Sequence, residues 1–298
     1  MKLTINNGIT WLLIVIVGLS QAGQVSSQTT AVEASKVVVR AEVTTSKFNS
    51  PLMGREMPYR LILPPDYKTK PEQSYATVYL LHGLGGNYQN WNALTRLAEY
   101  ALKHSFIIVI AEGGNGWYTD SLTVPNDKYE SYIVKDLIPE IDRTYRTIPD
   151  RNNRIMAGLS MGGYGSLKFG LKYPEMFSLI GTFSGAVNAA SYSENNSATA
   201  GRGIDKIMGP ENSEARMAND VFKLIHDLTP QKLRDLPYIY QSCGTEDYLV
   251  KNNRDLLALI NEKKVPHEYR EHPGGHDWMF WDAQIREFLN LAERRLKK

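Results

Sequence analysis

The chain has 298 residues, of which 42% are hydrophobic and 22% are charged, and this composition excludes collagen-like, disordered and coiled-coil proteins. Its 34 basic and 32 acidic side chains leave a formal net charge of +2. This balance does not indicate the clustered positive charge of a nucleic-acid binder. Cys243 is the only cysteine, which excludes an intrachain disulfide and a cysteine-based metal cluster.

The amino-terminal residues have the pattern of a secretory signal. Lys2 precedes an apolar run at residues 9–19, and small residues suited to a cleavage site follow it. The run is shorter than the roughly 20 residues that span a bilayer, but an uncleaved anchor is the alternative. We predict a signal peptide at residues 1–22, a flexible linker rich in Ser, Thr and Gln at 23–35, and one folded domain at 36–298.

After the linker, short apolar runs alternate with segments of helical period. The valines at 37–39 and 43 and the run at 59–63 predict two antiparallel strands that are connected near Gly54. We expect further strands at 77–81, 106–111, 154–157, 177–183, 237–243 and 267–271, and helices at 91–104, 129–145, 161–173, 252–263 and 278–296. This alternation predicts an α/β domain with a mainly parallel sheet that is covered by helices on both faces.

Residues 185–236 interrupt the alternation. They contain a Ser- and Asn-rich stretch at 191–197 and helical pieces at 219–228 and 230–236. An insertion after the fourth parallel strand would lie at the carboxyl edge of the sheet, where open α/β sheets bind ligands. Two interpretations stay open: a surface elaboration without function, and a small cap that shapes a substrate pocket.

The strongest chemical signal is the pattern Gly-x-Ser-x-Gly, formed by Gly158, Ser160 and Gly162 between an expected strand and an expected helix. A serine on such a sharp turn has a strained backbone, and the two glycines let neighbouring main chain approach closely. The amino end of the following helix directs N–H groups toward developing negative charge. The pattern predicts that Ser160 is a nucleophile.

A serine hydroxyl needs a base to accept its proton and a carboxylate to orient that base. In this setting the expected chain order is serine, carboxylate, histidine. His276, in a glycine-containing loop after the last strand, is the predicted base, and we interpret its rival His272 as structural. Asp247 is the predicted carboxylate, with Glu246 as the alternative. A metal pair of the two histidines is not expected, because a proline and two glycines separate them where a helix would be needed.

A glycine-rich loop, His-Gly-Leu-Gly-Gly-Asn, begins at His82 directly after an expected strand. Its glycines allow the main chain to approach a carbonyl oxygen. We predict that the N–H groups of Leu84 and Met161 form an oxyanion hole, with Gly83 or Gly85 as one-residue alternatives to Leu84. His82 is expected to hold the loop in place.

Four motifs together resemble a known family. They are the His82 loop with Trp91, Asn-Gly-Trp-Tyr-Thr-Asp at 115–120, the serine motif at 158–165, and Cys-Gly-Thr-Glu-Asp at 243–247. In this order they resemble the esterase D family of α/β-hydrolases, and most of all its tributyrin-esterase branch. The resemblance implies a serine carboxylesterase for short acyl chains, sometimes on acetylated or feruloylated sugars. The family also includes cytosolic S-formylglutathione hydrolases, against which the predicted export argues, and secreted mycolyltransferases.

From these observations we predict a secreted or periplasmic carboxylesterase that hydrolyses short-chain esters through a triad of Ser160, Asp247 and His276 and an acyl-enzyme. Three alternatives are acyl transfer to a carbohydrate or lipid acceptor, a thioesterase similar to S-formylglutathione hydrolase, and a catalytically silent binding module. The predicted partner is a small-molecule ester, without a cofactor, a metal, a nucleic acid or a stable membrane span after signal cleavage. The sequence leaves homo-oligomerisation open.

We also predict the roles of three residues in the motif at 115–120. Trp117 and Tyr118 are predicted to line an acyl or aromatic pocket, with core packing as the alternative, and Asp120 is expected to hold their loop by accepting backbone N–H bonds. Cys243 is expected to be a buried strand residue.

Overall fold

The computed structural model describes residues 41–193 and 203–296. The predicted signal peptide at 1–22, the linker at 23–35 and the valines at 37–39 lie outside the described residues. Of the expected first strand, the described part begins at Glu42 and continues to a turn in which the Gly54 N–H donates to the Ser50 carbonyl at 2.9 Å. The predicted antiparallel connection near Gly54 is thereby confirmed.

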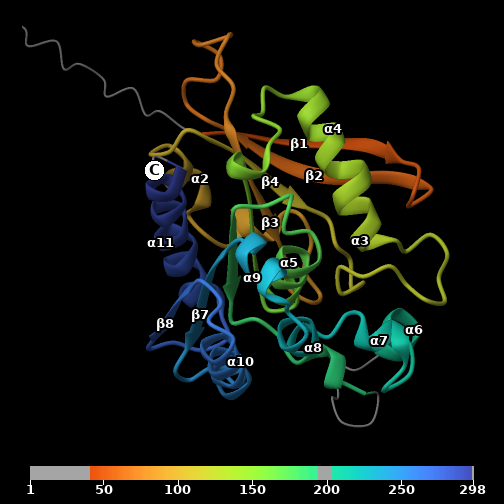
Figure 1. Ribbon diagram of the computed structural model, residues 1–298. Helices are drawn as coiled ribbons and strands as arrows, with labels where there is room; N and C mark the ends of the chain where they lie inside the picture. The colour runs from red at the N-terminus through yellow and green to blue at the C-terminus, as the bar shows by residue number, and fades with distance from the viewer. Residues whose placement is uncertain (1–40, 194–202, 297–298) are drawn as a thin grey trace, which may run out of the picture. The chain divides into compact units, whose positions relative to one another are not determined.

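An eight-stranded sheet with the order β1-β2-β4-β3-β5-β6-β7-β8 forms the centre of the described residues (Figure 1). The strands are β1 Glu42–Ser50, β2 Arg55–Leu63, β3 Ala76–Leu81, β4 Phe106–Ala111, β5 Arg154–Leu159, β6 Leu179–Phe183, β7 Tyr238–Gly244 and β8 His267–His272. β2 pairs antiparallel with β1 and β4, and all other neighbours pair parallel. The sheet is therefore mainly parallel, as predicted.

Helices cover both faces of this sheet. They are α1 Asn90–Ala93, α2 Leu97–Ala101, α3 Tyr129–Ser131, α4 Ile138–Thr144, α5 Met161–Lys172, α6 Ile204–Met208, α7 Glu214–Met217, α8 Val221–His226, α9 Pro230–Asp235, α10 Val250–Glu262 and α11 Trp278–Leu296. A π-helical segment, η1 Tyr132–Leu137, joins α3 to α4, and η2 Arg151–Asn153 and η3 Ala189–Ser191 are single 3₁₀ turns.

Two apolar clusters fill the space between the sheet and its helices, because successive side chains of a strand point to opposite faces. Val78 and Ile108 pack with α1, α2 and α11, whereas Tyr79 and Val109 pack with η1, α4, α5, α8 and α10. Every residue of β3, β4 and β5 is buried, which is typical of strands covered on both sides. Rigid strands of this kind fix the loops that follow them.

The prediction of a single helix at 91–104 is wrong, because this segment forms two separate helices, α1 and α2. The Thr95 hydroxyl accepts the Leu97 N–H at 3.1 Å, and the Arg96 N–H donates to Asp282 Oδ1 at 2.6 Å. Side chains thus replace backbone carbonyls as acceptors, which interrupts the helical ladder.

The insertion at 185–236 is only partly a separate element. Its helix α8 packs between α5 and α10 and so belongs to the layer that covers the sheet. Helix α9 leads into the start of β7, where the backbone oxygens of Asp235 and Leu236 accept hydrogen bonds from Arg151. The expected position of the whole insertion at the carboxyl edge is therefore wrong, since the chain must return to the amino edge to begin β7.

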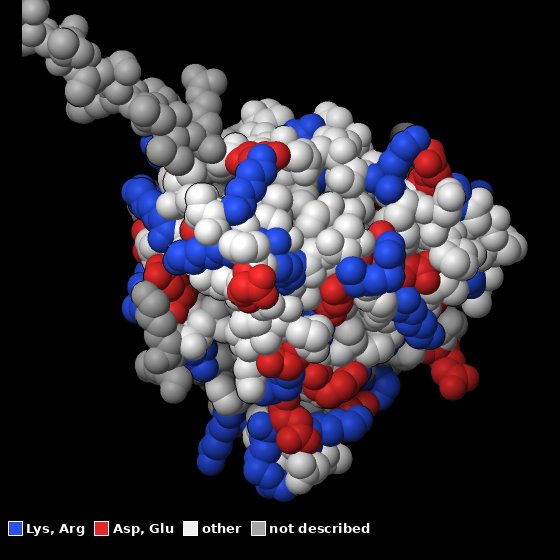
Figure 2. Space-filling model, turned by 90° about the horizontal axis from the view of Figure 1, so that it is seen from above, with Lys and Arg blue, Asp and Glu red and all other residues white. Residues whose placement is uncertain are grey.

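Charges of both signs share the surface. On the face shown in Figure 2, Lys and Arg side chains lie among Asp and Glu side chains, so neither sign forms a continuous field there. Within residues 41–193 and 203–296, no helix is long and apolar enough to cross a bilayer.

Candidate active site

Ser160 stands on the turn between β5 and α5, at the carboxyl edge of the sheet. Its backbone has φ 52° and ψ −117°, a conformation that is strained for a residue with a side chain. A Cβ atom at Gly158 would overlap the carbonyl group of Gly162, and one at Gly162 would overlap that of Leu81. The glycine spacing therefore has the steric cause expected from the sequence. The Ser160 N–H donates to the Phe183 carbonyl at 3.0 Å, which fixes the turn to β6.

Three predicted residues meet above this edge. The Ser160 hydroxyl lies 2.9 Å from His276 Nε2, and His276 Nδ1 lies 2.8 Å from Asp247 Oδ2. In the tautomer suited to a neutral imidazole, the serine donates to Nε2 and Nδ1–H donates to the carboxylate. The three residues follow the ends of β5, β8 and β7, so three separate strands position one continuous chain of hydrogen bonds.

The environment of Asp247 keeps its carboxylate charged. Only 2% of the residue is exposed, and this burial by itself would raise its pKa. The hydrogen bond from His276 and the 2.8 Å bond from the Leu249 N–H outweigh burial and hold the pKa of Asp247 below its ordinary value. An ionised carboxylate beside Nδ1 favours an imidazole that can accept a proton at Nε2.

The two rival residues lie outside this chain of hydrogen bonds. Glu246 is exposed, and its carboxylate accepts the Gly274 N–H while its own N–H donates to the Gly274 carbonyl at 3.1 Å. His272 is also exposed, and its backbone carbonyl accepts the Thr245 N–H at 2.9 Å. Both residues thus help to hold the loop that carries His276.

The predicted oxyanion donors lie beside Ser160. Met161 is the first residue of α5, and Leu84 lines the same cavity as Ser160. The Gly85 N–H donates to Asn115 Oδ1 at 2.8 Å, so this alternative donor already has an acceptor. The N–H groups of Leu84 and Met161 have no acceptor among residues 41–193 and 203–296. These two groups are therefore available to an oxygen atom of a substrate.

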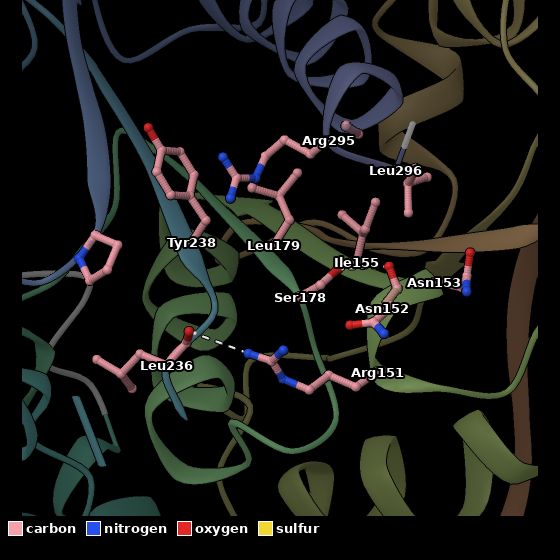
Figure 3. Close-up of a pocket in the computed structure, with 12 residues that line it drawn as sticks. Arg151, Asn152, Asn153, Ile155, Ser178, Leu179, Leu236, Tyr238, Arg295 and Leu296 are labelled. Carbon is pink, nitrogen blue, oxygen red and sulfur yellow. Dashed lines mark hydrogen bonds between the residues drawn. The ribbon is translucent and has the colours of Figure 1, made fainter. Parts of the chain in front are cut away.

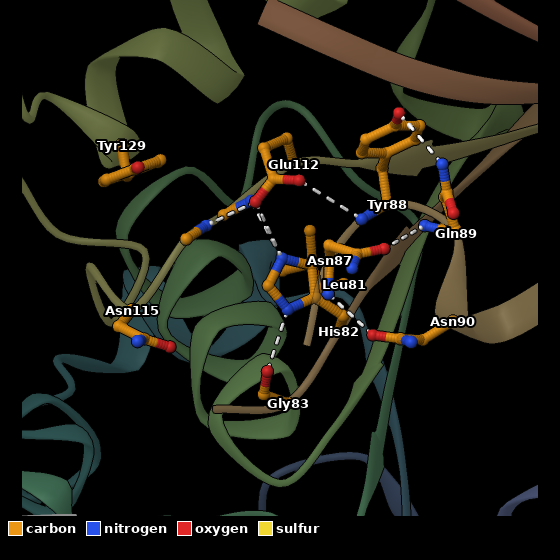
Figure 4. Close-up of polar contacts among 12 residues, drawn as sticks. Leu81, His82, Gly83, Asn87, Tyr88, Gln89, Asn90, Glu112, Asn115 and Tyr129 are labelled. Carbon is orange, nitrogen blue, oxygen red and sulfur yellow. Dashed lines mark hydrogen bonds and ion pairs between the residues drawn. The ribbon is translucent and has the colours of Figure 1, made fainter. Parts of the chain in front are cut away.

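A network of hydrogen bonds fixes the glycine-rich loop after β3 to the loop after β4 (Figure 4). The buried His82 ring donates from Nδ1 to the Gly83 carbonyl at 2.8 Å and accepts the Gly113 N–H at Nε2, at 2.9 Å. Glu112 accepts the N–H groups of Gly114 at 2.7 Å and of Tyr88 at 3.3 Å. These bonds tie the loop after β3 to the loop after β4, and the expected role of His82 is confirmed.

A cavity of about 530 Å³ opens beside the Ser160 hydroxyl. Aromatic side chains form much of its wall, namely Tyr248, Trp278 and Trp281. The Tyr248 ring, which is 74% exposed, lies 4.6 Å from the His276 ring, and the Trp281 ring meets the same imidazole edge-on at 4.9 Å. No described residue of the insertion lines this cavity.

The comparisons with known proteins show the family to which the chain belongs. A family model described as "Putative esterase" matches residues 50–290. The chain belongs to this esterase family. It is 31% identical over 250 residues to an acetyl esterase of Caldicellulosiruptor saccharolyticus, which covers 80% of this chain and 93% of that protein. It is 27% identical over 256 residues to an esterase of Mycobacterium tuberculosis, which covers 77% of this chain but only 54% of that protein.

Solved structures show the fold of the esterase. A ferulic acid esterase has a TM-score of 0.74 and 24% identity over 86% of this chain and 99% of that one. A fluorophosphonate-binding serine hydrolase of Staphylococcus aureus has a TM-score of 0.76 and 22% identity over 85% and 98%. An S-formylglutathione hydrolase of the same organism has a TM-score of 0.70 and 21% identity over 85% and 98%. The protein is a carboxylesterase with the α/β-hydrolase fold, and the resemblance to the esterase D family holds.

The prediction that Trp117 and Tyr118 line a pocket of the esterase is wrong. They are 1% and 0% exposed, and neither lines the cavity at Ser160. Their backbones have positive φ angles of 51° and 49°, and both side chains belong to the buried core. There the Tyr118 hydroxyl donates to the His82 carbonyl at 3.0 Å, and Trp117 meets Tyr164 edge-on at 5.8 Å. Core packing, the alternative interpretation, describes them.

Two other expectations are confirmed. Asp120 holds its loop by accepting the Ser131 N–H at 2.8 Å and the Ser131 hydroxyl at 2.6 Å. Cys243 is buried in β7, and burial raises the pKa of its thiol to about 12. The part of the chain that the structure describes contains no group of three or more His, Cys, Asp or Glu side chains arranged to hold a metal ion.

Sequence reasoning missed several residues that surround the site. Glu112, which joins two loops, is a charged residue directly after a fully buried strand, and that position was a usable signal. Tyr248 directly follows Asp247 in the chain, and this position next to a predicted catalytic residue was a different usable signal. Asn115 belongs to the motif at 115–120, but its bond to the Gly85 N–H joins residues 30 positions apart and could not be foreseen from that motif.

Proposed function

We propose that this esterase is exported and hydrolyses short-chain acyl esters, including acetyl or feruloyl esters of sugars, with Ser160, His276 and Asp247 as its catalytic triad. The unbroken hydrogen-bond chain from the Ser160 hydroxyl to the Asp247 carboxylate carries the proposal. The names of the similar acetyl esterase and ferulic acid esterase support the substrate class. The pattern of residues 1–22 supports export.

In the proposed first step, the Ser160 oxygen attacks the ester carbonyl carbon while His276 Nε2 takes the hydroxyl proton. The imidazolium that forms is stabilised by the Asp247 carboxylate, which stays ionised. The carbonyl oxygen becomes an oxyanion that accepts the N–H groups of Leu84 and Met161. Removing one such donor costs about 3–4 kcal/mol of transition-state stabilisation in a comparable serine hydrolase.

The tetrahedral intermediate then collapses to an acyl-enzyme. Its carbon–oxygen bond to the alcohol breaks, and His276 gives its proton to the leaving alkoxide. A water molecule next attacks the acyl carbon while His276 takes one of its protons. Collapse of the second intermediate returns that proton to Ser160 and releases the carboxylic acid.

The aromatic residues that line the cavity favour substrates with a flat or short acyl group. Tyr248, Trp278 and Trp281 offer apolar rings near the Ser160 hydroxyl, and a feruloyl group would stack on such surfaces. Sugar hydroxyl groups, which belong to the leaving alcohol, would face the open side of the cavity.

The decisive test replaces the nucleophile. Ser160→Ala should reduce hydrolysis of p-nitrophenyl acetate by at least about 10³-fold and abolish labelling by a fluorophosphonate probe. Ser166→Ala is a matched control, because this buried hydroxyl lies six residues further along the chain, within α5, and donates to the Gly181 carbonyl at 2.7 Å. If Ser160→Ala keeps most of the activity, the proposed mechanism is wrong.

Substrate class and export have separate tests. Acetyl and feruloyl sugar esters should be hydrolysed with higher kcat/KM than esters of long fatty acids. Product analysis with added sugar acceptors should yield mainly the free acid, whereas accumulation of acylated acceptor would favour acyl transfer. After cell fractionation, amino-terminal sequencing of the exported protein should begin near residue 23, and full-length protein in the cytosol would contradict export.

A further inference from the structure

A second cavity lies at the amino edge of the sheet, opposite the edge that carries Ser160. Its volume is about 570 Å³ (Figure 3). The starts of β5, β6 and β7, the turn η2 and the last turn of α11 surround it. Its accessible apolar surface comes from Tyr238, Pro266 and Leu296, and Arg151 and Arg295 bring two cations to it.

The Arg151 guanidinium is held in place by backbone carbonyl groups. Its Nε donates to the Pro174 oxygen at 2.8 Å, and its Nη2 donates to the oxygens of Asp235 at 3.1 Å and Leu236 at 3.3 Å. Its Nη1 has no acceptor among residues 41–193 and 203–296. The fixed guanidinium of Arg151 thus keeps only its Nη1 N–H groups free to donate.

The Arg295 guanidinium is held by an aromatic ring. Its central carbon lies 3.7 Å from the centroid of the Tyr238 ring, in a cation–π contact. Figure 3 shows Arg295 and Arg151 reaching toward the cavity from opposite sides, with Ser178 between them. No acidic side chain lines the cavity, and neither arginine forms an ion pair with any acidic residue that the structure describes.

We infer that this cavity binds a small carboxylic acid with an apolar body, such as an aromatic acid of the ferulate type. The planar guanidinium of Arg295 can match a carboxylate with two parallel hydrogen bonds, and Nη1 of Arg151 can donate one more. Because Arg151 is already held by three backbone carbonyl groups, its side chain loses little entropy on binding. The apolar surface between them suits an aromatic or aliphatic body, and the volume lies within the range of small-molecule sites.

The chemical class of this ligand connects the cavity to the reaction. Hydrolysis of feruloyl esters releases a free aromatic carboxylate, and the assignment of that product to the second cavity rests on the proposed function. Binding itself does not, because it requires neither Ser160 nor His276. The site would take the acid and reject both the ester and the corresponding alcohol, which lack a charged carboxylate.

The test uses protein whose active site is blocked. After covalent reaction of Ser160 with a fluorophosphonate, isothermal titration calorimetry with ferulate should detect binding, and coniferyl alcohol should show none. Arg295→Ala should weaken ferulate binding at least about tenfold. Arg294→Ala removes the same charge from the neighbouring exposed residue, which does not line the cavity, and should leave the affinity unchanged.

Three results would overturn the inference. Blocked protein that binds no ferulate would assign any binding to the active site. Equal losses in Arg294→Ala and Arg295→Ala would indicate a general charge effect. Unchanged affinity in Arg295→Ala would exclude this cavity. If Arg295→Ala melts at a lower temperature, Arg295→Lys provides a second variant, which keeps the charge and should still bind more weakly because it lacks the planar pair of donors.

Failure of this inference is distinguishable from failure of the proposed function. Turnover of p-nitrophenyl acetate by unblocked protein reports on Ser160 alone. An active esterase whose blocked form binds no ferulate would refute only the second site. An inactive protein, which a fluorophosphonate would not label, would refute only the proposed reaction if Arg295→Ala but not Arg294→Ala still weakened its ferulate binding.

Discussion

The two edges of the sheet hold polar side chains in different ways. At the carboxyl edge, the polar groups of Ser160, His276 and Asp247 bond to one another, and the chain ends in a hydroxyl that a reaction can use. At the amino edge, Arg151 is bound by backbone carbonyls and Arg295 by an aromatic ring. The first arrangement can pass a proton between the Ser160 hydroxyl and His276 while Asp247 stays ionised, whereas the second presents fixed charge.

Backbone strain is also unequal between the edges. Trp117, Tyr118, Ser160 and Ser184 have positive φ angles between 47° and 52°, and all four lie in loops that follow strands at the carboxyl edge. Of the described residues at the amino edge, Lys264, before β8, has a comparable angle of 56°. Each such residue costs about 1–3 kcal/mol. The strain is concentrated where the main chain must present N–H groups and a nucleophile at fixed positions.

The largest expected effect comes from breaking the polar chain at the carboxyl edge. Asp247→Asn should lower kcat by about 10⁴-fold, because an amide in this position can favour the tautomer that carries its proton on Nε2. Steady-state kinetics with p-nitrophenyl acetate measures the loss. Glu246→Gln is the matched control, since it changes the adjacent carboxylate in the same way. Similar losses in both variants would mean that Asp247 has no special role.

The next largest effect is expected on stability, from the buried ion pair between Lys168 and Glu130. Lys168, fully buried on α5, contacts Glu130 at 2.9 Å and donates to the Tyr118 carbonyl at 2.8 Å and the Thr119 hydroxyl at 2.6 Å. Glu130→Gln should lower the free energy of unfolding by about 3–5 kcal/mol, because it leaves a buried cation without its partner. Chemical denaturation measures the change. Arg143, whose ion pair with Glu140 is exposed, supplies the control Arg143→Gln, which should change stability by less than about 1 kcal/mol.

The same pair predicts how stability depends on pH. Burial alone would raise the pKa of Glu130, but Lys168 and Lys172 lower it well below its ordinary value of 4.5. As pH falls below about 4.5, the unfolded chain therefore binds a proton that the folded chain does not, and stability declines. Glu130→Gln should show a shallower decline in this range than the parent protein. An identical decline in both proteins would assign acid sensitivity to other carboxylates.

The sequence predicted the parts of this molecule that depend on local patterns. Fully apolar runs predicted β3 and β4, and the glycine spacing around Ser160 predicted the strained turn. Chain order then led to Asp247 and His276, which meet Ser160 in the structure.

Features that depend on distant contacts were not predictable in this way. The break between α1 and α2 requires Asp282, which is 186 residues from Arg96. The inward turn of Tyr118 requires the His82 carbonyl and the buried Lys168. An aromatic pair in a sequence motif is compatible with a pocket wall and with a core, and only tertiary packing decides between them.

A smaller effect is expected from loosening the loop that carries Leu84. Asn115→Ala removes the acceptor of the Gly85 N–H, so this group can compete with Leu84 for the substrate oxygen and the loop loses an anchor. We expect kcat to fall about tenfold, less than the loss of a whole oxyanion donor, with little change in KM or melting temperature. Asn261→Ala, on the exposed end of α10, is the control. A rise in KM with unchanged kcat would contradict a role of Asn115 in oxyanion geometry.

The smallest effect is expected at the aromatic ring of Tyr248. The ring lies 4.6 Å from His276 and is largely exposed, so Tyr248→Ala should lower kcat/KM by about two- to tenfold, the range of a single aromatic contact. Tyr248→Phe keeps the ring and should behave like the parent. Comparing an acetyl with a feruloyl ester separates two roles: an equal loss indicates support of the imidazole, whereas a loss confined to the feruloyl ester indicates contact with the acyl group. Parent-like rates of Tyr248→Ala with both esters would remove this ring from the site, and the aromatic contribution would then belong to Trp278 and Trp281 alone.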